Sequence, residues 1–331
     1  MRQIWQGEIP SEVYAREKQK ILMRENRKPV YIGVAIVCSV FLVFWILLNI
    51  IFLLNKEKGY EDYTIRKKQY YAEYTDEYDY WDVCTVEYPQ IEGIDYDLAV
   101  DINKLMYDTA MDRAYYWHFK PDSDVRKLQE EYHIFCNDVR CDVTYHSQYL
   151  LSVSYTEVYA PVSPVYYTNI TKRGLNIDLM TGEVYELNDI LRIDENFIRM
   201  WCKEAHSKYG DYVYYDAETC DLLYDLFTNN ADYIEDYYSI HTYFYVLDNK
   251  DLVIGLSMDP TAEGLWASEP QRDTYCVKIP QQELEKYKIE SEFWNKYEQS
   301  ESTGYVIPCE DLKSNIWLDE EGSVWSYWEE N

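Results

Sequence analysis

An uninterrupted apolar run, Val30–Leu54, is the feature that most constrains this chain. It contains no Asp, Glu, Lys, Arg or Pro, and Ser39 and Asn49 are its only strongly polar side chains. A helix needs about 20 apolar residues to cross roughly 30 Å of hydrocarbon, where the backbone must satisfy its own hydrogen bonds. We therefore predict one transmembrane helix over residues 30–54, in contact with membrane lipid. A buried core helix or a cleaved signal peptide is the alternative, but the first usually has a polar face and the second a shorter apolar region.

The segment before this run, residues 1–29, carries seven Lys and Arg against four Glu, a balance of +3. Positive charge resists translocation, so we expect this arm in the cytoplasm and the long C-terminal part outside the cell membrane. The basic residues that follow the run reduce the asymmetry; they are Lys56, Lys58, Arg66, Lys67 and Lys68. The reverse orientation is the alternative.

The chain is strongly acidic, with a net charge of −29 from 31 Lys and Arg and 60 Asp and Glu. Without the arm, 24 basic and 56 acidic residues remain, a balance of −32. Such a surface repels phosphate backbones, so we expect no nucleic acid among the partners. It attracts a cationic partner and speeds the encounter with it. A well-solvated acidic surface without any partner is the alternative.

Eight cysteines are present, and Cys38 lies inside the apolar run. The other seven would lie outside, where disulfides form, and an odd number leaves at least one unpaired in a monomer. Cys136 and Cys141 are the candidate disulfide, because a tight turn at Asn137–Asp138 would bring two strands into register. A zinc site would need a second close pair of Cys or His. A disulfide is therefore favoured over a metal site, and buried free thiols are the alternative.

Beyond the apolar run, the composition divides the chain into three parts. Residues 55–82 are rich in tyrosine and mixed in charge, which favours a juxtamembrane stalk, helical near Tyr63–Tyr74. Residues 83–298 contain runs of strand patterns and runs of helix patterns without regular alternation, which is typical of an α+β domain with an antiparallel sheet. Residues 299–331 form an acidic tail that packs as a last hairpin or stays loose.

Local patterns predict several elements of this domain. Apolar residues at three- and four-residue spacing predict a helix over Asp95–Trp117. Asp194 is a good N-cap for a second helix over Glu195–Tyr209, which should end at Gly210. Turns are predicted at Asn137–Asp138, Lys172–Gly174, Thr181–Glu183 and Asp248–Asp251, the last of these within a hairpin.

The sequence lacks the patterns that carry catalysis. Its five histidines are scattered, without an HExxH motif, and there is no GxSxG elbow, P-loop or GxGxxG motif. With 60 acidic residues, chance alone supplies paired carboxylates at any spacing. We therefore predict that the protein is not an enzyme, with no catalytic, cofactor-binding or metal-binding residues and no cofactor.

Five segments, in this order, resemble a bacterial extracytoplasmic domain of unknown function. They are YPQIEG (88–93), LLSVSYTEVY (150–159), LNIDLMTGEVYELNDIL (175–191), YFYVLDNKDLVIGLSM (243–258) and YCVKIP (275–280). This domain is found in RsiV-type anti-sigma factors, which bind lysozyme, and in the non-catalytic part of PdaC-type peptidoglycan deacetylases.

The resemblance implies a membrane-anchored sensor or binding protein of the lysozyme-responsive anti-sigma type. Its implied partners are a sigma factor at the cytoplasmic arm and a cationic protein such as lysozyme at the exterior domain. The alternative is a cell-wall-associated structural or binding module, with peptidoglycan as its partner and no signalling role.

Overall fold

The computed structural model describes residues 59–75, 81–131, 135–161, 169–210, 217–229, 233–234, 238–261, 274–313, 316–318 and 324–326, with short helical pieces between residues 15 and 45. The chain divides into two compact units, Met1–Lys58 and Gly59–Asn331.

In the first unit, residues 37–45 of the predicted membrane span form a helix with exposed side chains. The rest of Val30–Leu54 lies outside the described residues, as does most of the arm before it. Among the helices that are described, none has both the length and the apolar character needed to cross a membrane. The transmembrane helix therefore stays a prediction from the sequence.

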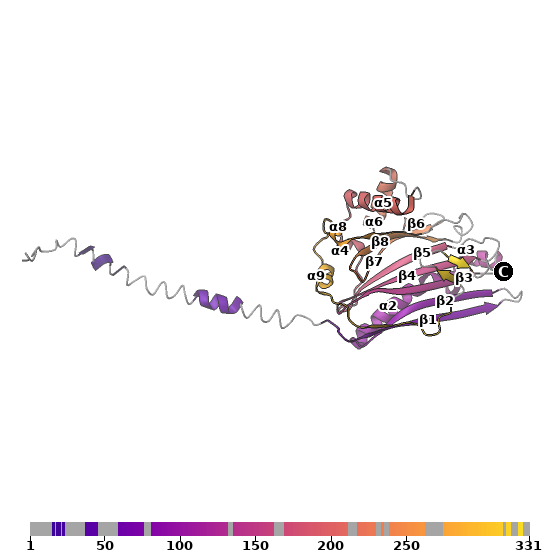
Figure 1. Ribbon diagram of the computed structural model, residues 1–331, viewed down its shortest axis with the longest axis horizontal. Coiled ribbons are helices and arrows are strands. Elements are labelled where there is room, and N and C mark those ends of the chain that lie inside the picture. The colour runs from indigo at the N-terminus through magenta and orange to yellow at the C-terminus, as the bar shows by residue number, and fades with distance from the viewer. Residues whose placement is uncertain are drawn as a thin grey trace, which may run out of the picture. The chain divides into compact units, whose positions relative to one another are not determined.

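The second unit is built on a six-stranded sheet in the order β10-β1-β2-β3-β4-β5 (Figure 1). Its strands are β1 Thr64–Thr75, β2 Trp81–Glu92, β3 Phe135–His146, β4 Leu150–Pro161, β5 Asn169–Asp178 and β10 Tyr305–Ile307. Two neighbouring pairs, β2 with β3 and β1 with β10, run parallel, and the others are antiparallel. The predicted α+β class is confirmed, but this sheet is mixed rather than antiparallel.

Strand β1 corrects the predicted stalk. The structure places Thr64–Thr75 in the sheet, paired with β2 along its whole length, so the stalk with a helix near Tyr63–Tyr74 is wrong. Tyr63 and Ile65 are buried, because alternate residues of a strand point to the same face and here face the core. The compact unit therefore begins at Gly59 rather than at residue 83.

Helix α2, Tyr96–Ala114, covers one face of this sheet and confirms the predicted helix over Asp95–Trp117. The carboxylate of Asp95 accepts hydrogen bonds from the N–H groups of Asp97 and Leu98, which caps its N-terminus. A short π-helix, η1 Tyr115–Phe119, and helix α3, Ser123–Glu131, follow. The buried side of α2 contains Ile102, Met106, Met111 and the alanines Ala110 and Ala114.

A four-stranded antiparallel sheet has the order β6-β7-β8-β9. Its strands are β6 Tyr233–Ile234, β7 Tyr238–Val246, β8 Leu252–Pro260 and β9 Thr274–Ile279. Figure 1 shows α5 Glu195–Tyr209 and α6 Ala217–Asn229 on one side of this sheet and β4 and β5 on the other. The shorter helices α4 Leu187–Ile190, α8 Gln281–Leu284 and α9 Glu292–Gln299 belong to the same unit. The predicted hairpin at Asp248–Asp251 and the Asp194 cap of α5 are both confirmed.

The two sheets meet where the edge of β7 approaches β4 and β5. Asn176 Nδ2 donates to the carbonyl oxygen of Phe244 at 2.8 Å, and the N–H of Val246 donates to Ser152 Oγ at 2.9 Å. These bonds satisfy backbone groups that a free strand edge would leave exposed. Gly174 lies at the same junction, and a Cβ there would come within 2.8 Å of the Phe244 carbonyl carbon. Glycine is therefore needed at this position for close approach of the sheets.

Two predicted turns are wrong, because the residues expected to form them lie inside continuous strands. Asn137–Asp138 lies inside β3, and Lys172–Gly174 lies inside β5, and both strands run on through these residues. The glycine that suggested a turn in β5 serves the contact with β7 instead. The turn at Thr181–Glu183 is confirmed, with Gly182 at φ 77°. In the acidic tail, β11 Ile316–Leu318 pairs with β12 Val324–Ser326, which is the hairpin alternative of the two expected for residues 299–331.

Candidate functional site

A pocket of about 390 Å³ lies beside β5, the last strand of the six-stranded sheet, where that strand meets α2, β7 and α6. It is lined by Leu105, Thr109, Arg173, Gly174, Leu175, Val184, Glu186, Leu226, His241, Thr242 and Tyr243. Pockets that hold small ligands are usually about 300–1,000 Å³ in volume, with a few convergent polar groups. This pocket therefore has the size and mixed lining of a small binding site.

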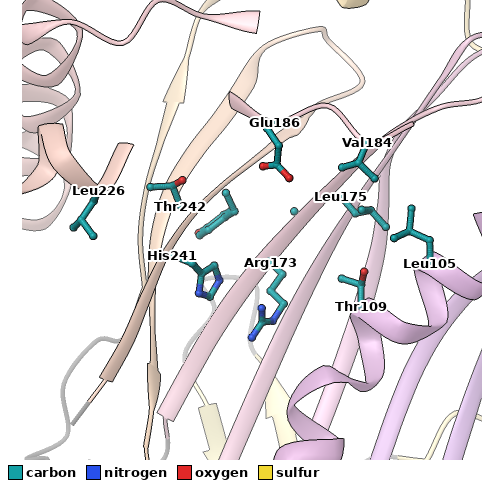
Figure 2. A pocket seen from close by; sticks show the side chains of 11 residues that line it. Leu105, Thr109, Arg173, Leu175, Val184, Glu186, Leu226, His241 and Thr242 are labelled. Atoms are coloured by element: carbon teal, nitrogen blue, oxygen red, sulfur yellow. The ribbon is translucent and has the colours of Figure 1, made fainter. Parts of the chain in front are cut away.

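The polar side chains of the pocket are arranged on opposite sides. Figure 2 shows Arg173 and His241 next to one another, with the carboxylate of Glu186 across the cavity and Thr109 presented by α2. Basic and acidic side chains thus face the same space from opposite sides.

Arg173 joins the pocket to a cluster of charges at the end of α2. Its guanidinium forms an ion pair with Asp259 on β8, and Nη2 lies 3.0 Å from Asp112 Oδ2 on α2. Its Nε is 3.6 Å from Glu157 Oε1 on β4. Glu157 and Asp259 are almost completely buried, at 0% and 3% exposure. Because buried carboxylates are costly unless paired, Arg173 stabilises the junction of α2 with both sheets.

Arg113, near the end of α2, is the second buried cation of this cluster. Its Nη2 donates to the carbonyl oxygen of Pro260 at 2.6 Å, and its Nε lies 4.0 Å from Asp259 Oδ2. The guanidinium also lies over the ring of Tyr116, 4.2 Å from its centroid, in cation–π geometry. The hydrogen bond and the charge hold α2 against the end of β8, and the ring contact, which is local to the helix, orients the guanidinium.

The cations determine the protonation of Asp259. Burial alone would raise the pKa of this carboxyl, but Arg173, His241 and Arg113 outweigh burial and hold the pKa below its ordinary value. Asp259 is therefore an anion at neutral pH, and it neutralises part of the positive side of the pocket.

His241 belongs to the same cluster. One ring nitrogen, Nε2, lies 3.2 Å from the carbonyl oxygen of Lys172, and Nδ1 lies 3.7 Å from Asp259 Oδ2. Both nitrogens thus face groups that orient the ring. A histidine that acts as a general base needs a nitrogen directed at the proton it removes. The geometry of His241 favours a structural role over catalysis.

The predicted disulfide between Cys136 and Cys141 is not supported by the fold. Both residues lie in the continuous strand β3, where five residues span about 16 Å at 3.3 Å per residue. This distance far exceeds what a disulfide can bridge, so the predicted pairing is wrong. Cys141 is a buried free thiol, and burial raises its pKa. The side chain of Cys136 lies outside the described residues.

The charged cluster was missed by sequence reasoning. The sequence pattern assigns Arg173 to a turn, and Glu157 and Asp259 are two of 60 acidic residues. A usable signal was present, since each of these carboxylates interrupts a strand that is otherwise mostly apolar. A lone charge in such a strand usually has a buried partner.

Within the part of the chain that the structure describes, no three His, Cys, Asp or Glu side chains gather closely enough to hold a metal ion. The prediction that the chain binds no metal or cofactor stays a prediction.

Comparison with known proteins gives distant structural neighbours. No family model matches the chain, and no curated protein matches it. A DUF3298 family member from Bacteroides fragilis NCTC 9343 is similar at a TM-score of 0.43 and 12% identity, over 72% of this chain and 99% of that one. A DUF3298 family protein from Pseudomonas aeruginosa PAO1 is similar at a TM-score of 0.38 and 11% identity, over 67% and 94%. DUF3298 is a domain of unknown function, and likeness this distant assigns no role to any residue here.

Proposed function

We propose that the chain is a membrane-anchored binding protein, with residues 30–54 as the span, the arm in the cytoplasm and the domain from Gly59 outside. The apolar run supports the anchor. In the described part of this run, Val40, Phe41 and Trp45 are each at least 63% exposed on a helix. Large apolar side chains exposed in a row on a helix suit contact with lipid or with another protein.

The observation that carries the proposed binding role is the distribution of acidic residues. Asp97, Asp101, Asp108 and Asp112 lie along the outer side of α2 at spacings of four, seven and four residues, and Lys104 occupies the position between Asp101 and Asp108. Lys104 pairs with Asp108, and Arg173 pairs with Asp112. Side chains three and four apart lie on the same side of a helix. Together with the balance of −32 outside the arm, this row favours a cationic protein partner, for which lysozyme is the proposed example.

The fuller form of this proposal is an anti-sigma factor of the lysozyme-responsive type. Its support is the resemblance of the five segments to the RsiV-type domain and the basic arm of residues 1–29. In this form the arm holds a sigma factor, and binding at the exterior domain controls its release.

A second candidate is a cell-wall-associated binding module, and the pocket favours it. Threonine hydroxyls of Thr109 and Thr242 and the carboxylate of Glu186 face a space of about 390 Å³. Hydroxyls and carboxylates bind sugars and peptide amines, which peptidoglycan offers. Both candidates are binding functions. His241 and Arg173, the basic side chains of the pocket, already have partners in the charged cluster, which favours binding over catalysis.

The test is calorimetric titration of the detergent-solubilised full chain with lysozyme and, separately, with soluble peptidoglycan fragments. We expect lysozyme binding that persists at about 0.15 M salt, where charge is screened over roughly 8 Å. The double variant Asp97→Asn/Asp101→Asn should weaken it several-fold. The matched control, Glu204→Gln/Asp221→Asn, removes two exposed charges from α5 and α6 and should change it less.

Three other outcomes are decisive. Binding that disappears at 0.15 M salt would reduce the interaction to nonspecific charge attraction. Equal weakening by both double variants would remove α2 as the binding face. Binding of peptidoglycan fragments but not lysozyme would replace the first candidate by the second.

A further inference from the structure

Two cysteines on neighbouring helices face each other in the core of the second unit. Cys202 on α5 and Cys220 on α6 have their sulfur atoms 3.8 Å apart, and both side chains are buried, at 0% and 9% exposure. They belong to the apolar cluster that also contains Trp201 and Phe227. Their distance in sequence is only 18 residues.

We propose that Cys202 and Cys220 are a disulfide-forming pair that joins α5 to α6. A disulfide has its sulfur atoms about 2.0 Å apart, so the thiols must approach by less than 2 Å. The two thiols lose two protons and two electrons as the S–S bond forms. A small-molecule disulfide accepts these two electrons and two protons and is reduced to two thiols. In the cell the reaction rests on the proposed exterior location, since disulfides persist in oxidising compartments.

Three other described cysteines of this unit, Cys84, Cys141 and Cys276, have different surroundings, and Cys309 lies on the segment after β10. Cys84 and Cys141 lie in the apolar cluster between the six-stranded sheet and α2. Cys276 on β9 has its sulfur near Lys208 Nζ and the hydroxyl of Tyr209, at 3.6 and 3.5 Å. Cys202 and Cys220 thus have their sulfur atoms close enough to form a disulfide with each other after a small approach.

Burial affects how the pair reacts. Burial and the neighbouring Cys220 raise the pKa of Cys202 to about 12, so this thiol is protonated at neutral pH. Because the thiolate is the attacking species, oxidation of the folded chain should be slow at pH 7 and faster at pH 9. Oxidation during folding, before α5 and α6 have packed together, should be faster than oxidation of the folded chain at pH 7 or at pH 9.

The bond would also stabilise one wall of the pocket. Helix α6 contributes Leu226 to that wall, and it is the helix that carries Cys220. A link between α5 and α6 would restrict movement of α6 away from β7. The pair therefore connects the redox state of the compartment to the shape of the candidate site.

The test uses the full chain, purified in detergent under reducing conditions and then exposed to oxidised glutathione at pH 9. Remaining thiols are blocked with N-ethylmaleimide under denaturing conditions, and peptides are identified by mass spectrometry. We expect a linked peptide pair containing Cys202 and Cys220, about 2 Da lighter than the two free peptides, with Cys84 and Cys141 carrying the label. Cys276→Ser should leave this link intact, and Cys220→Ser should abolish it.

A second measurement concerns stability. The oxidised chain should unfold roughly 5 °C or more above the reduced chain, because closing an 18-residue loop restricts the unfolded state. Cys220→Ser should show no difference between oxidising and reducing conditions. Label on both Cys202 and Cys220 after oxidation, or a link from either to another cysteine, would overturn the pairing.

The same mass measurement on chain extracted from acid-quenched cells separates this inference from the proposed function. A link both in the purified chain and in cells supports both. A link in the purified chain with free thiols in cells would keep the pairing and contradict the exterior location. No link in the purified chain would overturn the pairing whatever the location.

Discussion

Replacing Gly174 by alanine should loosen the contact between the two sheets. A Cβ at this position would lie 2.8 Å from the carbonyl carbon of Phe244, closer still to its oxygen, and 3.3 Å from its nitrogen. All three are backbone atoms, which cannot rotate away as a side chain can. The two sheets would therefore have to separate, or β5 would have to bend.

The size of this effect follows from what the separation breaks. Overpacking at a close contact costs about 1–3 kcal/mol. Separation would also stretch the bond from Asn176 to Phe244 O and the bond from Val246 N to Ser152, which contribute about 1 kcal/mol each. We expect Gly174→Ala to lower the free energy of unfolding by about 3–5 kcal/mol, and the unfolding temperature by roughly 6–20 °C.

Thermal unfolding of the full chain in detergent, followed by circular dichroism, measures this. The matched control is Gly255→Ala on β8, whose Cβ would come within 2.6 Å of the ring of Tyr243. That obstacle is the far end of a side chain, which can turn aside by giving up its hydrogen bond to Thr274, so the loss should be smaller. Asn176→Ala removes the donor to Phe244 O and the acceptor of Ser152 Oγ, so it should cost about 2 kcal/mol without forcing the sheets apart. Equal stability of Gly174→Ala and wild type would refute the close approach of β5 and β7.

The charged cluster and the helix cap give further expectations. Asp259→Asn should lower the free energy of unfolding by about 3–5 kcal/mol in chemical denaturation, because Arg113 and Arg173 lose their buried anion; a loss below about 1 kcal/mol would contradict the cluster. Since the folded-state pKa of Asp259 is lowered, its contribution should be complete above about pH 4 and disappear as the pH falls through that lower pKa. The stability difference between wild type and Asp259→Asn should therefore shrink on acidification, and a constant difference would count against ionisation. Asp194→Ala should cost about 1 kcal/mol, because two N–H groups of α5 lose their acceptor; an unchanged unfolding temperature would exclude a stabilising cap.

Local signals in the sequence predicted elements whose cause is local. The helix after Asp95, the cap at Asp194 and the turn at Gly182 depend on side chains and backbone within a few residues, and all three are confirmed. The hairpin at Asp248–Asp251 is of the same kind.

Elements that depend on distant partners were not predictable in this way. The tyrosine-rich segment Thr64–Thr75 becomes a strand because it pairs with β2 and, at its start, with β10, which is more than 200 residues away. Gly174 suggested a turn because its contact with Phe244, 70 residues later, is invisible in one sequence. The parallel pairing of β2 with β3 likewise follows from the position of α2 and α3 between them in the chain.

The candidate site shows the same limit. Arg173 and Glu157 come from the neighbouring strands β5 and β4, but Asp259 lies 86 residues after Arg173, and only the fold brings β8 and α2 to this pair. Among 60 acidic residues their pairing could not be read in advance. The overall acidity, by contrast, could be read directly, and it remains the basis of the proposed partner.

Protease accessibility on intact cells tests the proposed topology, on which the partner and the disulfide both depend. The chain would carry one epitope tag before Met1 and a different one after Asn331, and a protease that cannot cross the membrane would be added. We predict that the C-terminal tag is lost from intact cells while the N-terminal tag survives in the membrane fraction until the cells are lysed. Loss of the N-terminal tag alone, or protection of both tags, would contradict an exterior domain on a single span.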